Sequence, residues 1–552
     1  MIVASEHSCH KNKGKISETL STTSRYSAPL LITLLCLAAL ILNLSLNFPY
    51  RPFPSDEFVS YSYVLTNKNW LANRSEILFN SPLHIFSLVA VKQLTTLFGL
   101  HWLQTFLLTS ACSISGAALF LGLTVQKATG QLIFSSGATL FFLVSSWTQS
   151  YLHFYSYAPV VTLFMMASIY CFTRFYLTTD GNSWLAAGSG LCAGLFFLSG
   201  SSAKLLAGML ITAYVTLIYS SSQPRKKVLC FQLIGTALIP IIGLLPLYIG
   251  ALVFHLRTNV SAGNGIECLE KYGFLPTTPF PSFFYLLSVY SPVMLAFLGI
   301  SLFICIWQWK KLRQLGNRGT LILSLFGLVI IHTVVLDLLP FTKLGRTQYP
   351  LIVLALIALS LLYADLPVGK RVGRWLFFVF LVIALPLELS ASVHTRQVRR
   401  EAPAELAQLP ADTIFVTLNE DPHRGYITDW LTLDKMNIIH QASFSHSIQS
   451  LQSTNRPVAL IVGPTGPNSG KSTLENCHMD DFYFSLPQNI GRMPPAVIKL
   501  PYYAHYPLFM MEEETSQCFY FRHQVPDYRS KESQLTVYYW PATNPDLDRK
   551  RE

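Results

Sequence analysis

Charged residues are scarce in this sequence. Of 552 residues, 12% are charged and 51% are hydrophobic, and the mean hydropathy is +0.39. A soluble globular domain has about twice that charged fraction. The composition therefore argues against an ordinary soluble enzyme and indicates a membrane protein.

The sequence also lacks a signal-peptide cleavage site and an internal repeat, two features that would change this interpretation. The first apolar run, residues 29–48, follows a polar leader (residues 1–28) and has no small-residue cleavage site, so we expect a retained helix and not a signal peptide. No internal repeat is evident, although transporters often show repeat symmetry.

A basic excess does not indicate nucleic-acid binding here. The net charge is +11, but much of it lies in short loops between apolar runs, where it signals membrane orientation. We therefore expect no nucleic-acid partner.

Apolar runs of about 18 or more residues mark transmembrane helices. The fold class that follows is a mainly α, polytopic membrane protein of about 11 (11–13) transmembrane helices. The predicted spans lie near residues 29–48, 101–124, 132–150, 155–177, 184–199, 203–221, 229–255, 283–309, 320–340, 347–365 and 375–393.

The loop charges predict the orientation. With eleven spans the basic loops share one side, which puts the N-terminus in the cytosol and the C-terminus outside. The residues on the predicted cytosolic side include Lys127, Arg225, Lys226, Lys227, Lys310, Lys311, Arg313, Arg318, Lys370, Arg371 and Arg374.

Residues 81–100 are apolar enough to be a twelfth span. Counting them would invert every later loop, and Lys92 falls in the middle of the segment. We predict an interfacial helix within the first outer loop, residues 49–100, with a true span as the alternative.

Residues 394–552 differ from the rest. They contain prolines, charges and short strand-like runs at residues 413–418, 457–463 and 535–540. These features predict an extracytoplasmic soluble α/β domain after a transmembrane domain at residues 29–393.

Two motifs of this region are weak. Gly463–Thr473 ends in Gly-Lys-Ser, but Thr465 stands where a phosphate-binding loop needs glycine, so we expect neither nucleotide binding nor an ATP partner. Cys477-His478-Met479-Asp480-Asp481 matches no standard metal spacing, and a surface loop is the better interpretation.

The cysteines indicate little about function. Most lie inside apolar runs, where they act as small hydrophobic residues. Cys268, Cys477 and Cys518 fall outside the cytosol, and Cys477 and Cys518 can pair if that compartment is oxidising.

The predicted topology gathers polar residues at the outer membrane face. Asp56 and Glu57 lie in the first outer loop, where adjacent carboxylates are costly beside a bilayer. They could be a general base, a cation ligand or a solvated pair. The other candidates are His153, Tyr155, Tyr157, Lys204, Arg257, Asp337, Lys343, Arg346 and Tyr349.

These residue types suit one kind of chemistry. An acid can deprotonate an acceptor hydroxyl, and cations can stabilise the charge that grows on a phosphate leaving group.

Each residue has a plainer explanation too. Lys204 and Arg346 could be snorkelling residues, Asp337 could form a structural ion pair, His153 could be an ordinary interfacial histidine, and the tyrosines could belong to an aromatic belt.

The order of several motifs resembles the GT-C superfamily of membrane glycosyltransferases, and most closely glycosyltransferase family 39, with the protein O-mannosyltransferases and the lipid A aminoarabinose transferase. The motifs are SDEFVSY after the first span, SPLHIF through TLFGL, SYLHFYSYAPVV, GSSAKLL and GRTQYP. They span roughly residues 29–393.

The resemblance implies a function and a site. Such enzymes take a sugar from a polyprenyl-phosphate-linked donor outside the cytosol and transfer it, with inversion, to a lipid, glycan or protein acceptor. The first-loop acid acts as base, which implies Asp56 with Glu57 beside it. Lys204, Arg346 and Lys343 would then bind the donor phosphate.

Two departures separate this sequence from the named branches. Where some relatives have a second acid, this sequence has His153-Phe154-Tyr155, and Asn80 and Ser81 stand directly before Pro82, without the lysine that the aminoarabinose branch has there. The acceptor, and with it the donor sugar, can therefore differ. Asp56 and Glu57 could bind a divalent metal, and the sequence leaves metal dependence open.

The leading interpretation is thus a lipid-linked sugar transferase, most consistent with a bacterial inner membrane. The alternative is a multi-pass transporter or flippase for a lipid-linked or small solute, which would use the same charges to bind cargo.

Overall fold

The computed structural model describes residues 27–46, 64–65, 81–100, 104–152, 155–178, 182–200, 203–221, 225–246, 249, 283–284, 287–288, 291–338, 348–366, 369–396, 404–418, 439–442, 456–462, 496–502 and 533–541. The chain divides into a helical unit that reaches Val393 and a unit that holds the strands after His394. The phosphate-loop-like segment, Cys268, Cys477 and Cys518 lie outside the described residues. The predicted domain bounds and the Cys477–Cys518 pairing stay predictions.

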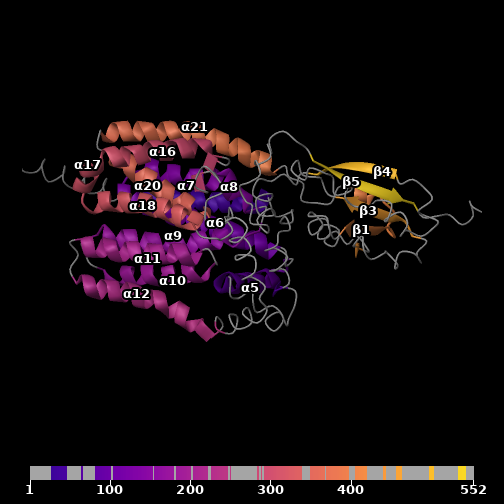
Figure 1. The fold of residues 1–552 in the computed structure, drawn as a ribbon, viewed down its shortest axis with the longest axis horizontal. Helices are drawn as coiled ribbons and strands as arrows, with labels where there is room; N and C mark the ends of the chain where they lie inside the picture. Colours follow the sequence, from indigo (N-terminus) through magenta and orange to yellow (C-terminus); the bar gives the residue numbers. More distant parts are fainter. Residues whose placement is uncertain are drawn as a thin grey trace, which may run out of the picture. The chain divides into compact units, whose positions relative to one another are not determined.

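The helical unit is a bundle of helices (Figure 1). After the first helix, Ser27–Leu46, come α5 (Pro82–Leu97), α6 (Gln104–Thr129), α7 (Leu132–Val144), α8 (Ser146–Ser150), α9 (Ala158–Tyr176), α10 (Ser183–Leu198), α11 (Ala203–Ser220), α12 (Lys226–Gly243), α16 (Pro292–Trp307), α17 (Trp309–Gln314), α18 (Asn317–Leu338), α20 (Pro350–Ala364), α21 (Lys370–Arg396) and the short α22 (Ala404–Ala407).

Among the described residues, seven helices are long and apolar enough to cross a membrane: the first helix, α6, α9, α11, α12, α18 and α21. The shorter apolar helices α7, α10, α16 and α20 lie where the sequence predicts four further spans. An integral, multi-pass membrane protein follows from these helices. The predicted count of about eleven spans stays a prediction, because a helix needs about 20 residues to span the hydrocarbon core.

Helix α20 lies at the centre of the helical unit. Every residue from Pro350 to Ala364 is buried, and α20 packs against α6, α7, α9, α16 and α18. A helix that is apolar on all sides is buried on all sides. Its position brings its two ends into contact with polar residues of the surrounding helices.

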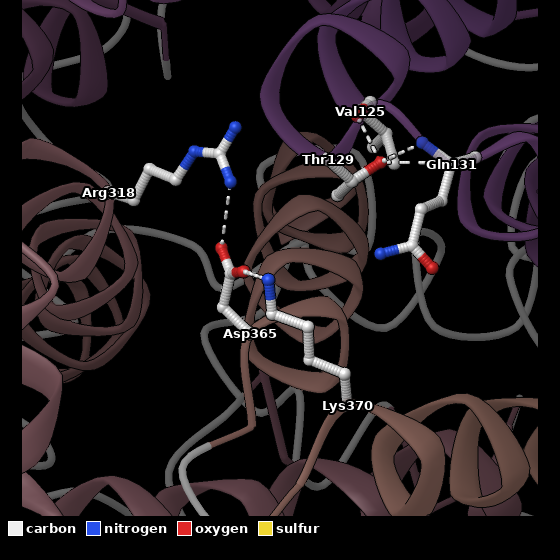
Figure 2. Close-up of polar contacts among 6 residues, drawn as sticks. All are labelled: Val125, Thr129, Gln131, Arg318, Asp365 and Lys370. Atoms are coloured by element: carbon white, nitrogen blue, oxygen red, sulfur yellow. Dashed lines mark hydrogen bonds and ion pairs between the residues drawn. The ribbon is translucent and has the colours of Figure 1, made fainter.

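One end of the helical unit holds a cluster of charges. The Asp365 carboxylate, 10% exposed, lies 3.5 Å from the Arg318 guanidinium and 3.9 Å from the Lys370 ammonium. Figure 2 shows these three residues and, in the same view, the end of α6, where the Thr129 hydroxyl donates to the Val125 carbonyl and accepts from the Gln131 backbone N–H. Arg318 and Lys370 are among the cations that the sequence places in the cytosol, and that orientation stays a prediction.

The strands of the second unit form a mixed five-stranded sheet in the order β2-β1-β3-β5-β4. They are β1 (Ile414–Leu418), β2 (Ile439–Ala442), β3 (Val458–Val462), β4 (Ala496–Tyr502) and β5 (Ser533–Trp540). Strand β1 pairs in parallel with β2 and β3, and β5 pairs antiparallel with β3 and β4. Strands β1, β3 and β5 lie where the sequence predicts strands, whereas β2 and β4 were not predicted.

Candidate functional site

The structure describes four of the predicted site residues with their side chains: Tyr155, Tyr157, Lys204 and Tyr349. The backbone of Asp337 lies in the last turn of α18, and its side chain is not described. The other candidates, Asp56, Glu57, His153, Arg257, Lys343 and Arg346, lie outside the described residues. Their roles stay predictions.

Three of the sequence motifs meet at the start of α9. His84 of α5 is fully buried, and its ring meets that of Tyr157 edge-on, with the centroids 6.4 Å apart. Tyr157 directly precedes α9 and also covers Gly200, because a Cβ at Gly200 would lie 2.7 Å from the Tyr157 ring. Glycine is therefore needed for this contact, which brings together the motifs SPLHIF, SYLHFYSYAPVV and GSSAKLL, the last of which begins at Gly200.

Lys204 lies in the first turn of α11, shortly after Gly200 in the sequence, and is half-buried. Lys204 and Gly200 therefore belong to the same motif, GSSAKLL. Burial lowers the pKa of His84 from 6.5 to about 3, so the imidazole is neutral at physiological pH. A neutral imidazole and a phenol are able to bind hydroxyl groups, and a lysine is able to bind a phosphate.

Helix α5 is anchored to the preceding loop through Lys92. Its ammonium donates to the Leu65 carbonyl. Lys92 was the residue that argued against a span at 81–100, and this bond satisfies its charge with a backbone acceptor. Helix α5 also packs against α6 and α10, toward the same end of the helical unit as α8 (Figure 1). Whether it spans the membrane stays a prediction.

The predicted continuous span at 132–150 is wrong. Helix α7 ends at Val144, Ser145 has a non-helical backbone (φ −53°, ψ 131°), and α8 begins at Ser146. Such a break frees backbone groups that the bilayer cannot satisfy, so protein groups must bind them.

Side chains bind three of the backbone groups beside the break. The Ser146 N–H donates to the Glu388 carboxylate at 2.9 Å. The Ser392 hydroxyl donates to the Val144 carbonyl at 2.5 Å, and the Gln149 amide donates to the Leu143 carbonyl at 2.6 Å. Two of these three side chains, those of Glu388 and Ser392, come from α21, so the packing of α21 against the break satisfies its free backbone groups.

Tyr349 links the break to α20. Its side chain is fully buried, its hydroxyl donates to Thr148 Oγ1 at 3.2 Å, and its ring meets Tyr151 edge-on at 4.7 Å. These contacts make Tyr349 a packing residue between α8 and α20. Tyr155 is buried as well, 2% exposed.

Sequence reasoning missed His84 and Glu388. The signal for Glu388 was present, because it is the only acid between Lys370 and Arg396 and an ionisable residue in such a run needs a partner. His84 stands in SPLHIF, and the pattern of that motif gives no sign that this residue is buried against Tyr157.

Among the described residues, no group of three or more His, Cys, Asp and Glu could hold a metal ion. The two carboxylates that raised the question of a divalent metal, Asp56 and Glu57, are not among these residues. Metal dependence therefore stays open.

No protein-family model matches the chain, and no curated protein matches it. Similar solved structures include the crystal structure of ArnT from Cupriavidus metallidurans bound to undecaprenyl phosphate, with 14% identity and a TM-score of 0.46; the match covers 79% of this chain and 93% of that one. They also include cryo-EM structures of the arabinofuranosyltransferase AftD from Mycobacteria, with 16% and 15% identity and TM-scores of 0.44 and 0.43. These cover 93% and 94% of this chain but 40% and 42% of AftD, so the chain spans about two fifths of that protein.

Proposed function

We propose that this protein transfers a sugar from a polyprenyl-phosphate-linked donor to a lipid, glycan or protein acceptor on the extracytoplasmic face of a membrane. The observation that carries the proposal is the contact of His84, Tyr157 and Gly200. These residues belong to three motifs whose order in the sequence resembles membrane glycosyltransferases. Motifs that are far apart in the sequence are thus brought together at one end of a multi-pass helical unit.

The proposed chemistry needs one base and a cationic site. Asp56, with Glu57 beside it, would take the proton of the acceptor hydroxyl as that oxygen attacks the anomeric carbon from the face opposite the phosphate, which inverts the configuration. The bond to the phosphate oxygen breaks, and the phosphate leaves as an anion that needs no proton. Lys204, Lys343 and Arg346 would stabilise the charge that grows on it.

The remaining candidates would surround these groups. In the sequence, His153 and Tyr155 follow α8 and Arg257 follows α12, whereas Asp337 lies in the last turn of α18, each on the predicted outer side. Helix α5, with its buried His84, would form the membrane-facing edge of the site, where a donor with a lipid tail can enter. The cell membrane of a bacterium, with the N-terminus in the cytosol, is the setting that fits this arrangement.

The test is donor turnover by the purified protein in nanodiscs. A panel of polyprenyl-phosphate sugars would be offered with a membrane extract as acceptor, and released polyprenyl phosphate measured. We expect turnover by wild type, at least a hundredfold loss in Asp56→Asn because a general base contributes about 10²–10⁴ in rate, and a raised KM for the donor in Lys204→Gln. Lys127→Gln, a lysine at the end of α6 that the proposal leaves out, is the matched control. Equal turnover in wild type and Asp56→Asn would remove Asp56 from the mechanism.

One observation favours the alternative, a transporter or flippase. The break between α7 and α8 is a discontinuous helix, and such helices form the cargo sites of many transporters. Proteoliposomes that hold a labelled lipid-linked sugar in one leaflet distinguish the two functions. Movement of the label without release of polyprenyl phosphate would favour transport.

A further inference from the structure

Glu388 is a buried acid that the proposed chemistry does not use. Glu388 is 4% exposed. It lies in the second half of α21, two residues after Pro386, a proline inside the helix. An ionisable residue inside a membrane-spanning helix is costly, and it is commonly retained because it does something specific. The specific role of Glu388 follows from its hydrogen bond to the Ser146 backbone N–H.

The carboxylate replaces a helical hydrogen bond. In an uninterrupted helix the N–H of Ser146 would donate to the carbonyl of Phe142, four residues earlier. Because Ser145 turns the chain out of the helix, that bond is absent and the N–H donates to Glu388 Oε2 at 2.9 Å instead. The hydroxyl groups of Ser146 and Ser291 also lie beside the carboxylate. Glu388 is therefore the acceptor that makes the break at Ser145 tolerable in the interior of the protein.

The break determines where α8 points. Helix α8 holds Thr148, whose hydroxyl binds Tyr349, and Tyr349 directly precedes α20. In the sequence, Tyr349 follows the turn with Lys343 and Arg346, and α8 precedes His153 and Tyr155. One short helix is thus connected to two of the segments in which the sequence predicts outer-face site residues.

We propose that Glu388 is a positioning residue: by accepting the Ser146 N–H it fixes α8, and through Thr148 and Tyr349 it fixes the start of α20 beneath the site of the proposed transferase. The inference rests on the proposed function for its catalytic consequence. The contact with Ser146 that it depends on is independent of that function.

Two variants separate a hydrogen-bond role from a charge role. Glu388→Gln keeps an oxygen that can accept the Ser146 N–H, whereas Glu388→Met fills a similar volume and accepts nothing. Ser392→Ala, one turn further along α21, is the matched control because it removes the other bond from α21 to the break and leaves the Ser146 N–H bound.

Hydrogen–deuterium exchange of a peptide covering residues 144–152, in nanodiscs, measures the break directly. We expect exchange about tenfold faster in Glu388→Met, because a buried N–H without an acceptor shifts a local opening equilibrium by about that factor, and near wild-type exchange in Glu388→Gln. Donor turnover should fall about tenfold in kcat in Glu388→Met with an unchanged KM for the donor and be restored in Glu388→Gln, as expected when the loss is one of geometry.

Three results would overturn the proposal. Wild-type exchange in Glu388→Met would mean that Glu388 does not hold α8. Equal losses in Glu388→Gln and Glu388→Met would mean that the negative charge matters and not the bond. Faster exchange with unchanged kcat would leave a purely structural role. If wild type turns over no donor, the proposed function fails and the catalytic consequence fails with it, while the exchange data still decide whether Glu388 fixes α8.

Discussion

The backbones of helices α10 and α12 lie close together because glycines of α10 face α12. Replacing one of these glycines by alanine should push the two helices apart. A Cβ at Gly190 would lie 2.1 Å from the Leu233 carbonyl oxygen and 2.3 Å from Thr236 Oγ1. At Gly194, the Cβ would lie 2.2 Å from the Ala237 carbonyl oxygen. Ordinary contacts between carbon and oxygen are about 3.3–3.6 Å, so the backbones would have to move apart by about 1 Å. Small residues at such positions are what permits close packing of helices in membranes.

The expected cost of Gly190→Ala follows from three terms. Overpacking costs about 1–3 kcal/mol. The shift also stretches the bond from the Thr236 hydroxyl to the Ala187 carbonyl, now 2.8 Å, and such a bond contributes about 1 kcal/mol. Alanine offsets about 1 kcal/mol of this through its higher helix propensity. We therefore expect a net loss of about 1–3 kcal/mol in the free energy of unfolding.

The measurement is unfolding by sodium dodecyl sulfate in mixed micelles, followed by tryptophan fluorescence. Gly188→Ala is the matched control, since it lies on the same helix and its Cβ would meet only Cys171 Sγ at an ordinary 3.7 Å. That variant should be as stable as wild type or up to about 1 kcal/mol more stable. If Gly190→Ala and Gly188→Ala unfold at the same detergent fraction, the close approach of α10 and α12 is not as described.

The remaining predictions concern three polar contacts. Burial lowers the pKa of His84 from its unfolded value of 6.5 to about 3. The folded protein therefore protonates His84 only at a lower pH than the unfolded chain does. The stability that depends on neutral His84 is then present above about pH 6.5 and is lost as the pH falls toward 3. Melting temperatures measured against pH should therefore fall less at acid pH in His84→Gln than in wild type. An identical decrease of melting temperature with pH in the two proteins would contradict this. Tyr349→Phe keeps the ring but removes the bond to Thr148, which should lower the free energy of unfolding by about 1 kcal/mol, with Tyr219→Phe, an exposed tyrosine of α11, as the comparison. Asp365→Asn should cost less than about 1 kcal/mol because the cations beside it are exposed, and the loss should shrink further at high salt; a larger, salt-independent loss would show that the cluster is effectively buried.

The sequence predicted the helices well and the interruptions poorly. Long apolar runs place helices reliably, since few other structures bury so much apolar surface. The break at Ser145 escaped detection because residues 132–150 are uniformly compatible with a helix and the acceptor for Ser146 lies 242 positions away. No local pattern contains that information.

Strand β4 shows a similar limit. Its sequence includes Pro501, which argues against a central strand, and the structure places β4 at an edge of the sheet, where proline is tolerated. Strand β2 has four residues, too few for an alternation to be recognised. In the site, sequence order found the motifs of His84, Tyr157 and Gly200, but only the fold reveals that Tyr157 lies against both His84 and Gly200.

The connections of the mixed sheet have a consequence for the second unit. From β1 the chain continues to β2 on one side, whereas from β3 it continues to β4 on the other side, so the strand order reverses between β1 and β3. In open α/β sheets, ligands bind in the crevice beyond the carboxyl ends of the strands at such a topological switch point. Here that point lies past Leu418 and Val462, the last residues of β1 and β3. Under the proposed function, substitutions at these two strand ends would test whether the second unit binds a ligand there.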